Sequence, residues 1–150
     1  MYNLKQFNGT FKGIIGECLF KFTKKDVIIP KFFNKNKYSL IFGRYFNEAQ
    51  IRFLIDNWYS IDAIEILFER GRNKIILYEV KTNNYERIEK GFRTKITQST
   101  VDIYNKAKKL GFDVKTAYVL LLDNWNYGVE INEFKAEDFC VDRPKVYDKH

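Results

Sequence analysis

Hydrophobic and polar residues alternate in the middle of the chain in a pattern that is typical of β-strands. Residues 61–68 alternate, and residues 74–81 form a second extended apolar run. The segment 70–73 between them contains Gly71 and is rich in residues that favour turns. The pattern therefore predicts a β-hairpin with a glycine-containing loop.

Two amphipathic helices are predicted, one on each side of this hairpin in the sequence. The first covers residues 10–24, and its predicted buried stripe consists of Phe11, Ile14, Ile15, Cys18, Leu19 and Phe22. Glu17 lies off this stripe, on the polar flank of the helix. The second covers residues 95–110 and ends before Gly111, a residue favoured after helix ends. Its predicted buried stripe consists of Ile96, Thr100, Ile103, Tyr104, Ala107 and Leu110.

Four further segments carry shorter patterns. Residues 27–30 and 38–42 predict short strands, and Pro30 indicates that the first of them lies at a sheet edge or ends there. Residues 50–57 fit either a strand or a short helix. The apolar run 117–122 predicts a central strand that is buried on both faces and parallel to its neighbour across the second helix.

Length and composition favour a single packed domain. The chain has 150 residues, of which 45% are hydrophobic and 17% aromatic. Together with the element order, this predicts one α/β domain over residues 1–150, with a central mixed β-sheet flanked by helices. The sequence lacks an apolar run of about 20 residues and a recognisable signal peptide, so we expect an intracellular protein without a membrane partner.

The two cysteines, Cys18 and Cys140, are far apart and form no Cys-x-x-Cys pair. We expect both to be small apolar core residues rather than zinc ligands or disulfide partners. His150 is the only histidine and lies at the end of the sequence. Histidine-activated nucleophiles and histidine zinc sites are therefore excluded.

Two carboxylates and a lysine are predicted to meet at the open end of the hairpin. The two-residue period of a strand places Glu79 and Lys81 on one face, and Asp62 begins the partner strand. Mg²⁺ typically binds one or two protein carboxylates and completes its shell with water and phosphate oxygens. This pattern predicts a Mg²⁺ site in which Lys81 serves the attacking water, with Mn²⁺ as a substitute ion. The alternative to this site is a solvated ion pair between Glu79 and Lys81. Asp56 is a rival of Asp62 as the metal-binding aspartate, but it lies in an Asp-Asn turn and is less favoured.

Asp62 with Glu79-Val80-Lys81, set in the order helix, hairpin, helix and strand, resembles the PD-(D/E)XK nuclease superfamily. That superfamily includes archaeal Holliday-junction resolvases and RecB-like nucleases, and the resemblance covers about residues 10–122. Ile61 departs from the proline that often precedes the aspartate. The resemblance implies a restriction-endonuclease-like core and a metal-dependent DNA nuclease, in which Asp62 and Glu79 bind the metal and Lys81 is catalytic.

The resemblance also assigns roles to two residues on the helices. Resolvases carry a glutamate on the first helix that binds the metal or a metal-bound water, and Glu17 occupies a similar place; the alternative is an i,i+4 ion pair with Lys21. RecB-like nucleases carry Gln-x-x-x-Tyr on the later helix, which implies that Gln98 fixes the substrate phosphate or the active-site water. Here Asp102 stands in the fourth place after Gln98, so the motif is incomplete, and helix N-terminal polarity alone also explains a glutamine there.

Most of the net charge of +7 lies near the start of the chain. Residues 1–37 contain eight lysines and two acidic residues, which give this segment a charge of +6. Lysines that neutralise phosphates confer salt-sensitive binding without base preference, so we expect double-stranded DNA to be bound with little sequence specificity. The alternative is a solvated lysine-rich surface. The expected DNA contacts are Lys12, Lys21, Lys24, Lys25, Arg87, Lys90 and Arg93.

Two other functions stay open from the sequence. One is a Holliday-junction resolvase that acts as a homodimer, and the other is a catalytically inactive nucleic-acid-binding domain of the same fold. Residues 123–150 carry no recognised chemistry. Within them, Trp125 and Tyr127 fit either a dimer face or a cover over the last strand.

Overall fold

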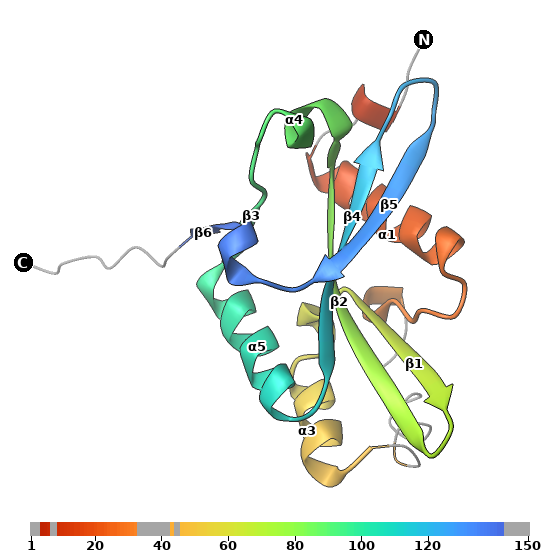
Figure 1. The fold of residues 1–150 in the computed structure, drawn as a ribbon, viewed down its shortest axis with the longest axis vertical. Helices are drawn as coiled ribbons and strands as arrows, with labels where there is room; N and C mark the ends of the chain where they lie inside the picture. Colours follow the sequence, from red (N-terminus) through yellow and green to blue (C-terminus); the bar gives the residue numbers. More distant parts are fainter. Residues whose placement is uncertain (1–3, 7–8, 33–42, 44–45, 143–150) are drawn as a thin grey trace, which may run out of the picture.

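The computed structural model describes residues 4–6, 9–32, 43 and 46–142 of the chain. A four-stranded mixed sheet in the order β1-β2-β4-β5 lies at its centre (Figure 1). β1 and β2 form the predicted antiparallel hairpin, β2 and β4 are parallel, and β4 and β5 are antiparallel. The strands are β1 (Ala63–Glu69), β2 (Arg72–Asn84), β4 (Asp113–Leu121) and β5 (Tyr127–Glu133). The predicted α/β class, mixed sheet and parallel buried strand are confirmed.

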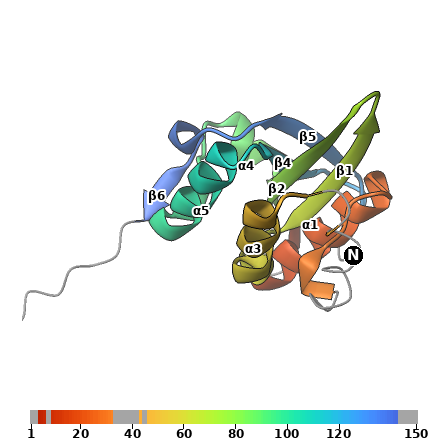
Figure 2. The ribbon, with the colours of Figure 1, turned by 90° about the horizontal axis from the view of Figure 1, so that it is seen from below.

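Helices flank this sheet, as Figures 1 and 2 show. The helices are α1 (Gly9–Thr23), α3 (Glu48–Asp56), α4 (Tyr85–Glu89) and α5 (Gln98–Lys109). Short 3₁₀ turns complete the chain: η1 (Leu4–Gln6), η2 (Pro30–Phe32), η3 (Trp58–Ser60) and η4 (Ala136–Asp138). A separate two-stranded parallel sheet joins β3 (Lys95–Thr97) to β6 (Cys140–Asp142).

β2 is the strand on which the two hydrophobic clusters of the described residues meet. Residues 75–80 are all buried because alternate side chains enter different clusters. Ile75 and Leu77 pack in the cluster that contains residues of α3 and α5, whereas Ile76 and Tyr78 pack with Phe20 of α1. α1 and α5 therefore cover opposite faces of the sheet, and the end of β2 lies between them.

The face that α1 turns toward the sheet differs from the predicted one. Gly16, Glu17 and Phe20 are buried, while Phe11 and Phe22 of the expected apolar stripe are exposed. The physical reason is a close approach at Gly16, where a Cβ atom would lie 1.7 Å from Thr82 Oγ1 of β2. Only glycine allows the helix to come so close, and this contact sets its rotation. The predicted buried stripe was therefore wrong, and Glu17, which lies off that stripe, is buried.

Other local predictions were partly correct. Residues 27–30 form a single bridge, Ile28 with Ile64, before η2, instead of a strand. Residues 50–56 belong to α3, which begins with a capping box between Asn47 and Gln50, and residue 57 is the C-cap of the helix. The predicted strand at residues 38–42 lies outside the described residues. None of the described helices is long and apolar enough to cross a membrane.

The second predicted helix begins three residues late, because residues 95–97 form β3 and Thr97 caps α5. Its fully buried residues are Val101, Tyr104 and Ala107. Cys18 and Cys140 are both exposed, so their assignment as core residues was wrong. Tyr127 begins β5, which pairs with the edge of β4. This agrees with the alternative in which Tyr127 covers the predicted last strand.

Candidate functional site

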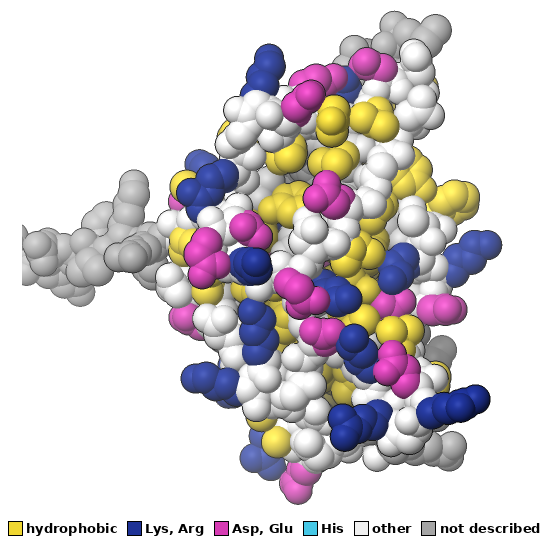
Figure 3. All heavy atoms as spheres, viewed as in Figure 1, with side chains coloured by type: hydrophobic (Ala, Val, Ile, Leu, Met, Phe, Trp, Pro, Cys, Tyr) yellow, Lys and Arg dark blue, Asp and Glu magenta, His cyan; other side chains and the backbone are white. Residues whose placement is uncertain are grey.

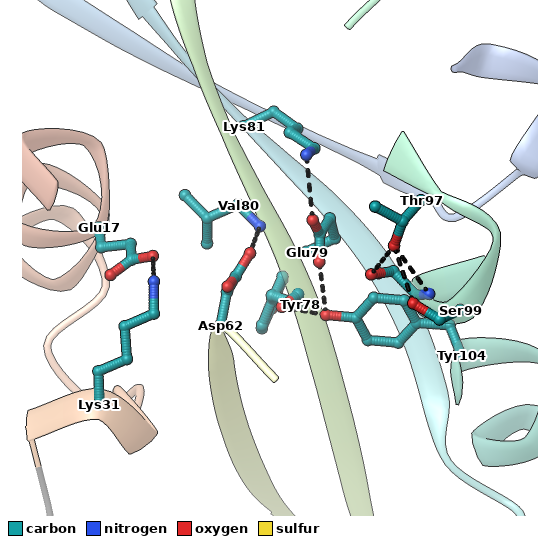
Figure 4. Close-up of polar contacts among 11 residues, drawn as sticks. Glu17, Lys31, Asp62, Tyr78, Glu79, Val80, Lys81, Thr97, Ser99 and Tyr104 are labelled. Atoms are coloured by element: carbon teal, nitrogen blue, oxygen red, sulfur yellow. Dashed lines mark hydrogen bonds and ion pairs between the residues drawn. The ribbon is translucent and has the colours of Figure 1, made fainter. Parts of the chain in front are cut away.

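Asp62 lies where the hairpin opens. The β1–β2 pairing ends at Ala63 opposite Tyr78, while β2 continues to Asn84. Asp62 Oδ2 accepts a hydrogen bond of 2.9 Å from the Val80 backbone N–H. The side chain thus takes the place that a backbone carbonyl would occupy if the ladder continued. This bond fixes the Asp62 carboxylate beside Glu79, as the hairpin predicted (Figure 4).

Glu79 is buried and both of its carboxylate oxygens have partners. The Tyr104 hydroxyl of α5 donates to Glu79 Oε2 at 2.8 Å and also reaches the Tyr78 carbonyl oxygen at 3.2 Å. Lys81 Nζ lies 3.3 Å from Glu79 Oε1. Burial and the charges of Glu79 and Asp62 raise the pKa of Tyr104 well above its usual range, so the phenol stays a donor. α5 therefore holds Glu79 in place.

Glu17 approaches the same region from α1. It is only 5% exposed, and Lys31 Nζ of η2 lies 2.7 Å from its Oε1. Glu17 Oε2 is buried without a hydrogen-bond partner among the described residues. Burial raises the pKa of Glu17, Lys31 opposes this, and the charge of Asp62 adds to it. The alternative of an ion pair with Lys21 was wrong, because Lys21 donates to the carbonyl oxygens of Lys25 and Val27.

Burial, followed by the charge of Glu79, raises the pKa of Asp62 from 3.8 to about 7. The Val80 N–H bond and Lys31 oppose this shift without cancelling it. The folded protein therefore binds a proton at Asp62 more tightly than the unfolded chain does. The stabilisation from this proton is complete below about pH 4 and is lost as the pH rises through about 7.

Asp62→Asn is expected to raise the melting temperature at pH 8 by about 3 °C or more, since the neutral amide keeps the bond to Val80 without burying a charge. The gain should be small near pH 4, where Asp62 is protonated in the folded protein and about half protonated in the unfolded chain. Thermal unfolding followed by circular dichroism at both pH values measures it. Mg²⁺ should stabilise the wild type at pH 8 and leave the variant unchanged. An equal gain at pH 4 and pH 8 would contradict the assigned pKa.

A shallow groove of about 140 Å³ lies on the α5 side of the site. Its lining residues are Glu79, Lys81, Lys95, Ile96, Thr97, Thr100 and Asp142. Thr97 and Thr100 exchange a hydrogen bond of 2.8 Å between their hydroxyl groups. Lys95, Thr97 and Thr100, like Tyr104 and Lys31, were not predicted as site residues. For Lys31, Lys95 and Thr97 the only sequence signal was polarity, which is common to most surface positions. Thr100 and Tyr104 were predicted only as part of the buried stripe of the second helix.

Two residues considered from the sequence are not among those that line this groove. Gln98 is the first residue of α5, and its amide nitrogen donates to Asp102 Oδ1 at 2.9 Å, as expected for a polar helix start. Asp56 ends α3 and lines a larger hollow of about 670 Å³ between α3 and α5. That hollow is lined by none of the site carboxylates Asp62, Glu79 and Glu17.

The predicted DNA-contacting residues divide into three groups. Several are engaged in the fold: Lys21 with backbone carbonyl groups, Lys24 with Glu65 at 3.3 Å, and Arg93 with the carbonyl oxygens of Glu137 and Phe139. Lys25 and Lys90 are exposed. On the face shown in Figure 3, basic side chains are interspersed with acidic ones rather than gathered in one patch.

Lys12 and Arg87 form a different kind of group, because they are neighbours of like charge. Burial and the charge of Arg87 lower the pKa of Lys12. Neither makes an ion pair with an acidic side chain in the part of the chain that the structure describes. Arg87 also lies over the Phe92 ring at 4.1 Å. Such a pair suits an anion such as a phosphate.

The carboxylates fit a hard divalent cation with a water-rich shell. No group of three or more His, Cys, Asp and Glu side chains has metal-site spacing among residues 4–6, 9–32, 43 and 46–142. Asp62 and Glu79 are adjacent, however, and two carboxylates suffice for Mg²⁺. Glu17, with its buried oxygen that has no partner, is suited to bind a water of that shell.

The site and the fold together define a class of protein: an α/β domain with a mixed sheet, a carboxylate pair and a lysine at the opening of its hairpin. No protein-family model matches the chain, and comparisons with curated proteins and solved structures find no match.

Proposed function

We propose that this protein is a metal-dependent nuclease of the PD-(D/E)XK type, with a restriction-endonuclease-like core, that hydrolyses phosphodiester bonds in DNA. One observation carries the proposal: Asp62 is held on the Val80 N–H beside Glu79, with Lys81 3.3 Å from Glu79. The order of α1, the β1–β2 hairpin, α5 and the parallel strand β4 supports it, since it resembles the order in that superfamily.

Each residue has a defined part in the proposed reaction. Asp62 and Glu79 would hold Mg²⁺ or Mn²⁺, which when bound polarises a phosphate and makes a water more acidic. Lys81, two residues beyond Glu79 and partly exposed, orients the attacking water and offsets developing negative charge. Tyr104 is a positioning residue, because its hydroxyl holds Glu79. The Thr97 and Thr100 hydroxyls in the groove are suited to bind phosphate oxygens.

The proposed substrate is double-stranded DNA, bound with little sequence specificity. Lys12 and Arg87 support it as a pair of cations without acidic partners in the described structure. Such residues contact the phosphate backbone, which is the same for every sequence. Binding should therefore weaken steeply as the salt concentration rises.

Cleavage assays on linear duplex, circular plasmid, single-stranded DNA, RNA and a four-way junction test this function, with Mg²⁺ or Mn²⁺ and with chelator. We expect chelator-sensitive cleavage of duplex DNA. Lys81→Ala should lower the rate by about a hundredfold or more and leave DNA binding intact. Lys74→Ala is the matched control, because Lys74 lies on the same strand and pairs with Asp113 at 3.2 Å, away from the site.

The other outcomes are equally clear. Salt-sensitive DNA binding without cleavage under either metal would identify an inactive binding domain and contradict the nuclease proposal. Cleavage confined to the four-way junction, by a protein that is dimeric in light scattering, would identify a Holliday-junction resolvase. Equal cleavage by wild type and Lys81→Ala would exclude the assigned centre.

A further inference from the structure

Lys31 is an exposed lysine whose ammonium group lies beside one carboxylate of the acidic cluster. Its Nζ lies 2.7 Å from Glu17 Oε1, and Figure 4 shows it extending from η2 to that carboxylate. Burial alone would lower the pKa of Lys31, but Glu17, Asp62 and Glu79 together raise it. All three acidic side chains of the proposed metal site therefore act on this one ammonium group.

Hydrogen bonds hold the backbone on both sides of Lys31, and this places its ammonium group next to Glu17. Trp58 Nε1 donates to the Pro30 carbonyl oxygen at 3.0 Å, and the Phe32 N–H bonds to the Ile29 carbonyl at 3.0 Å. The Ile28–Ile64 bridge then connects this segment to β1, next to Asp62. Lys31 and Asp62 are thus carried by two segments that are hydrogen-bonded to each other.

Glu17 has the features of a carboxylate that is shared between two cations. Its Oε1 is neutralised by Lys31, whereas its Oε2 is buried without a partner among the described residues. A buried ionised carboxylate is costly unless a cation accompanies it. A divalent ion at Asp62 and Glu79 would offer Glu17 a second positive charge and would repel the first one.

We propose that Lys31 is a built-in cation that neutralises Glu17 in the metal-free protein and competes with the divalent ion for that carboxylate. This inference rests on the proposed function, because it takes Asp62 and Glu79 as the metal ligands. Lys31 keeps the acidic cluster folded before the metal binds, and it lowers the affinity of the site for the metal.

Mn²⁺ binding to the purified protein at pH 8 without DNA, followed by the electron paramagnetic resonance of free Mn²⁺, tests the proposal. Lys31→Met should bind Mn²⁺ roughly tenfold more tightly than the wild type, because a unit positive charge near the ion is removed. Lys31→Arg, which keeps the charge, should bind close to the wild type. Lys24→Met is the matched control and should leave Mn²⁺ binding unchanged, since Lys24 also pairs with a buried glutamate, Glu65, at 3.3 Å.

A double-mutant cycle separates competition at Glu17 from a general effect of charge. In a Glu17→Gln background, Lys31→Met should gain much less affinity, because the shared carboxylate is gone. An equal gain in both backgrounds would overturn the proposal, as would Mn²⁺ binding by Lys31→Met that is no tighter than that of the wild type. Thermal melting confirms that each variant folds.

The readout is independent of DNA cleavage, so the two proposals fail in different ways. A protein that binds Mn²⁺ with the expected Lys31 effect but cuts no nucleic acid would contradict only the nuclease function. A protein whose wild-type and Lys31→Met forms both fail to bind Mn²⁺ would overturn the inference on Lys31 and the metal-dependent mechanism together.

Discussion

Glu79→Gln is expected to lower the rate of metal-dependent DNA cleavage by about a thousandfold while the protein still folds. The amide keeps the size of the side chain and an oxygen that can accept the Tyr104 hydrogen bond, which measures 2.8 Å in the wild type. It removes the negative charge that the metal ion requires, and it leaves Lys81 without its partner at 3.3 Å. Single-turnover cleavage of a labelled duplex measures the loss, and filter binding of the same duplex shows that the substrate is still bound.

Glu65→Gln provides a closely matched control for this variant. Glu65 is also buried, also accepts a bond of 2.7 Å from a tyrosine hydroxyl, that of Tyr78, and also pairs with a lysine, Lys24. It lies on β1, outside the site. We expect a loss of stability comparable to that of Glu79→Gln but nearly full cleavage activity. If both variants lose activity alike, buried charge in general, and not the proposed metal ligand, is responsible.

Gly16→Ala is expected to destabilise the protein by about 2–3 kcal/mol, the usual effect of forcing atoms into a packed contact. The new Cβ would lie 1.7 Å from Thr82 Oγ1 and 2.8 Å from Thr82 Cβ, so α1 would have to move away from β2. Because Glu17 follows Gly16, this movement would also displace a carboxylate of the site. Denaturant unfolding measures the stability, and Mn²⁺ binding should weaken in parallel.

Gly13→Ala is the control for the effect of alanine in the same helix. Nothing lies within 4 Å of the position of its Cβ, and alanine favours a helix over glycine by up to about 1 kcal/mol. This variant should therefore be as stable as the wild type or more so. Thr82→Ala should rescue Gly16→Ala in part, because it removes the nearer of the two clashing atoms. Equal stability of Gly13→Ala and Gly16→Ala would contradict the close approach of α1 to β2.

The hairpin and its three site residues could be predicted because their geometry is local. A strand has a two-residue period, so Glu79 and Lys81 had to share a face wherever the strand lay. A glycine-containing loop, here with Gly71 at φ 78°, returned the chain so that Asp62 came to the end of β2 that carries Glu79. The continuous apolar run of β4 likewise indicated a strand buried on both faces before its neighbours were known.

The rotation of α1 could not be predicted, since the apolar stripe and the side of the helix that carries Gly16 point in different directions. The stripe is the usual guide to the buried face of a helix, and Glu17 lies off it, on the polar flank. The close contact of Gly16 with Thr82 decided otherwise and buried Glu17. The face of a helix that packs against a sheet depends on the shape of the opposing strand. The sequence of the helix carries no information about that shape.

By itself, the sequence determined the hairpin strands β1 and β2, the shared face of Glu79 and Lys81, and the position of Asp62 beside Glu79, because each follows from short-range backbone geometry. Only the tertiary structure decided which side chains from distant segments complete the site: Lys31 from η2, Tyr104 from α5 and Thr97 from β3. Lys31 stands among many lysines in its segment, and Tyr104 among many buried aromatic residues. Their contacts with Glu17 and Glu79 arise from packing between elements, which links residues far apart in the chain and leaves no periodic signal in it.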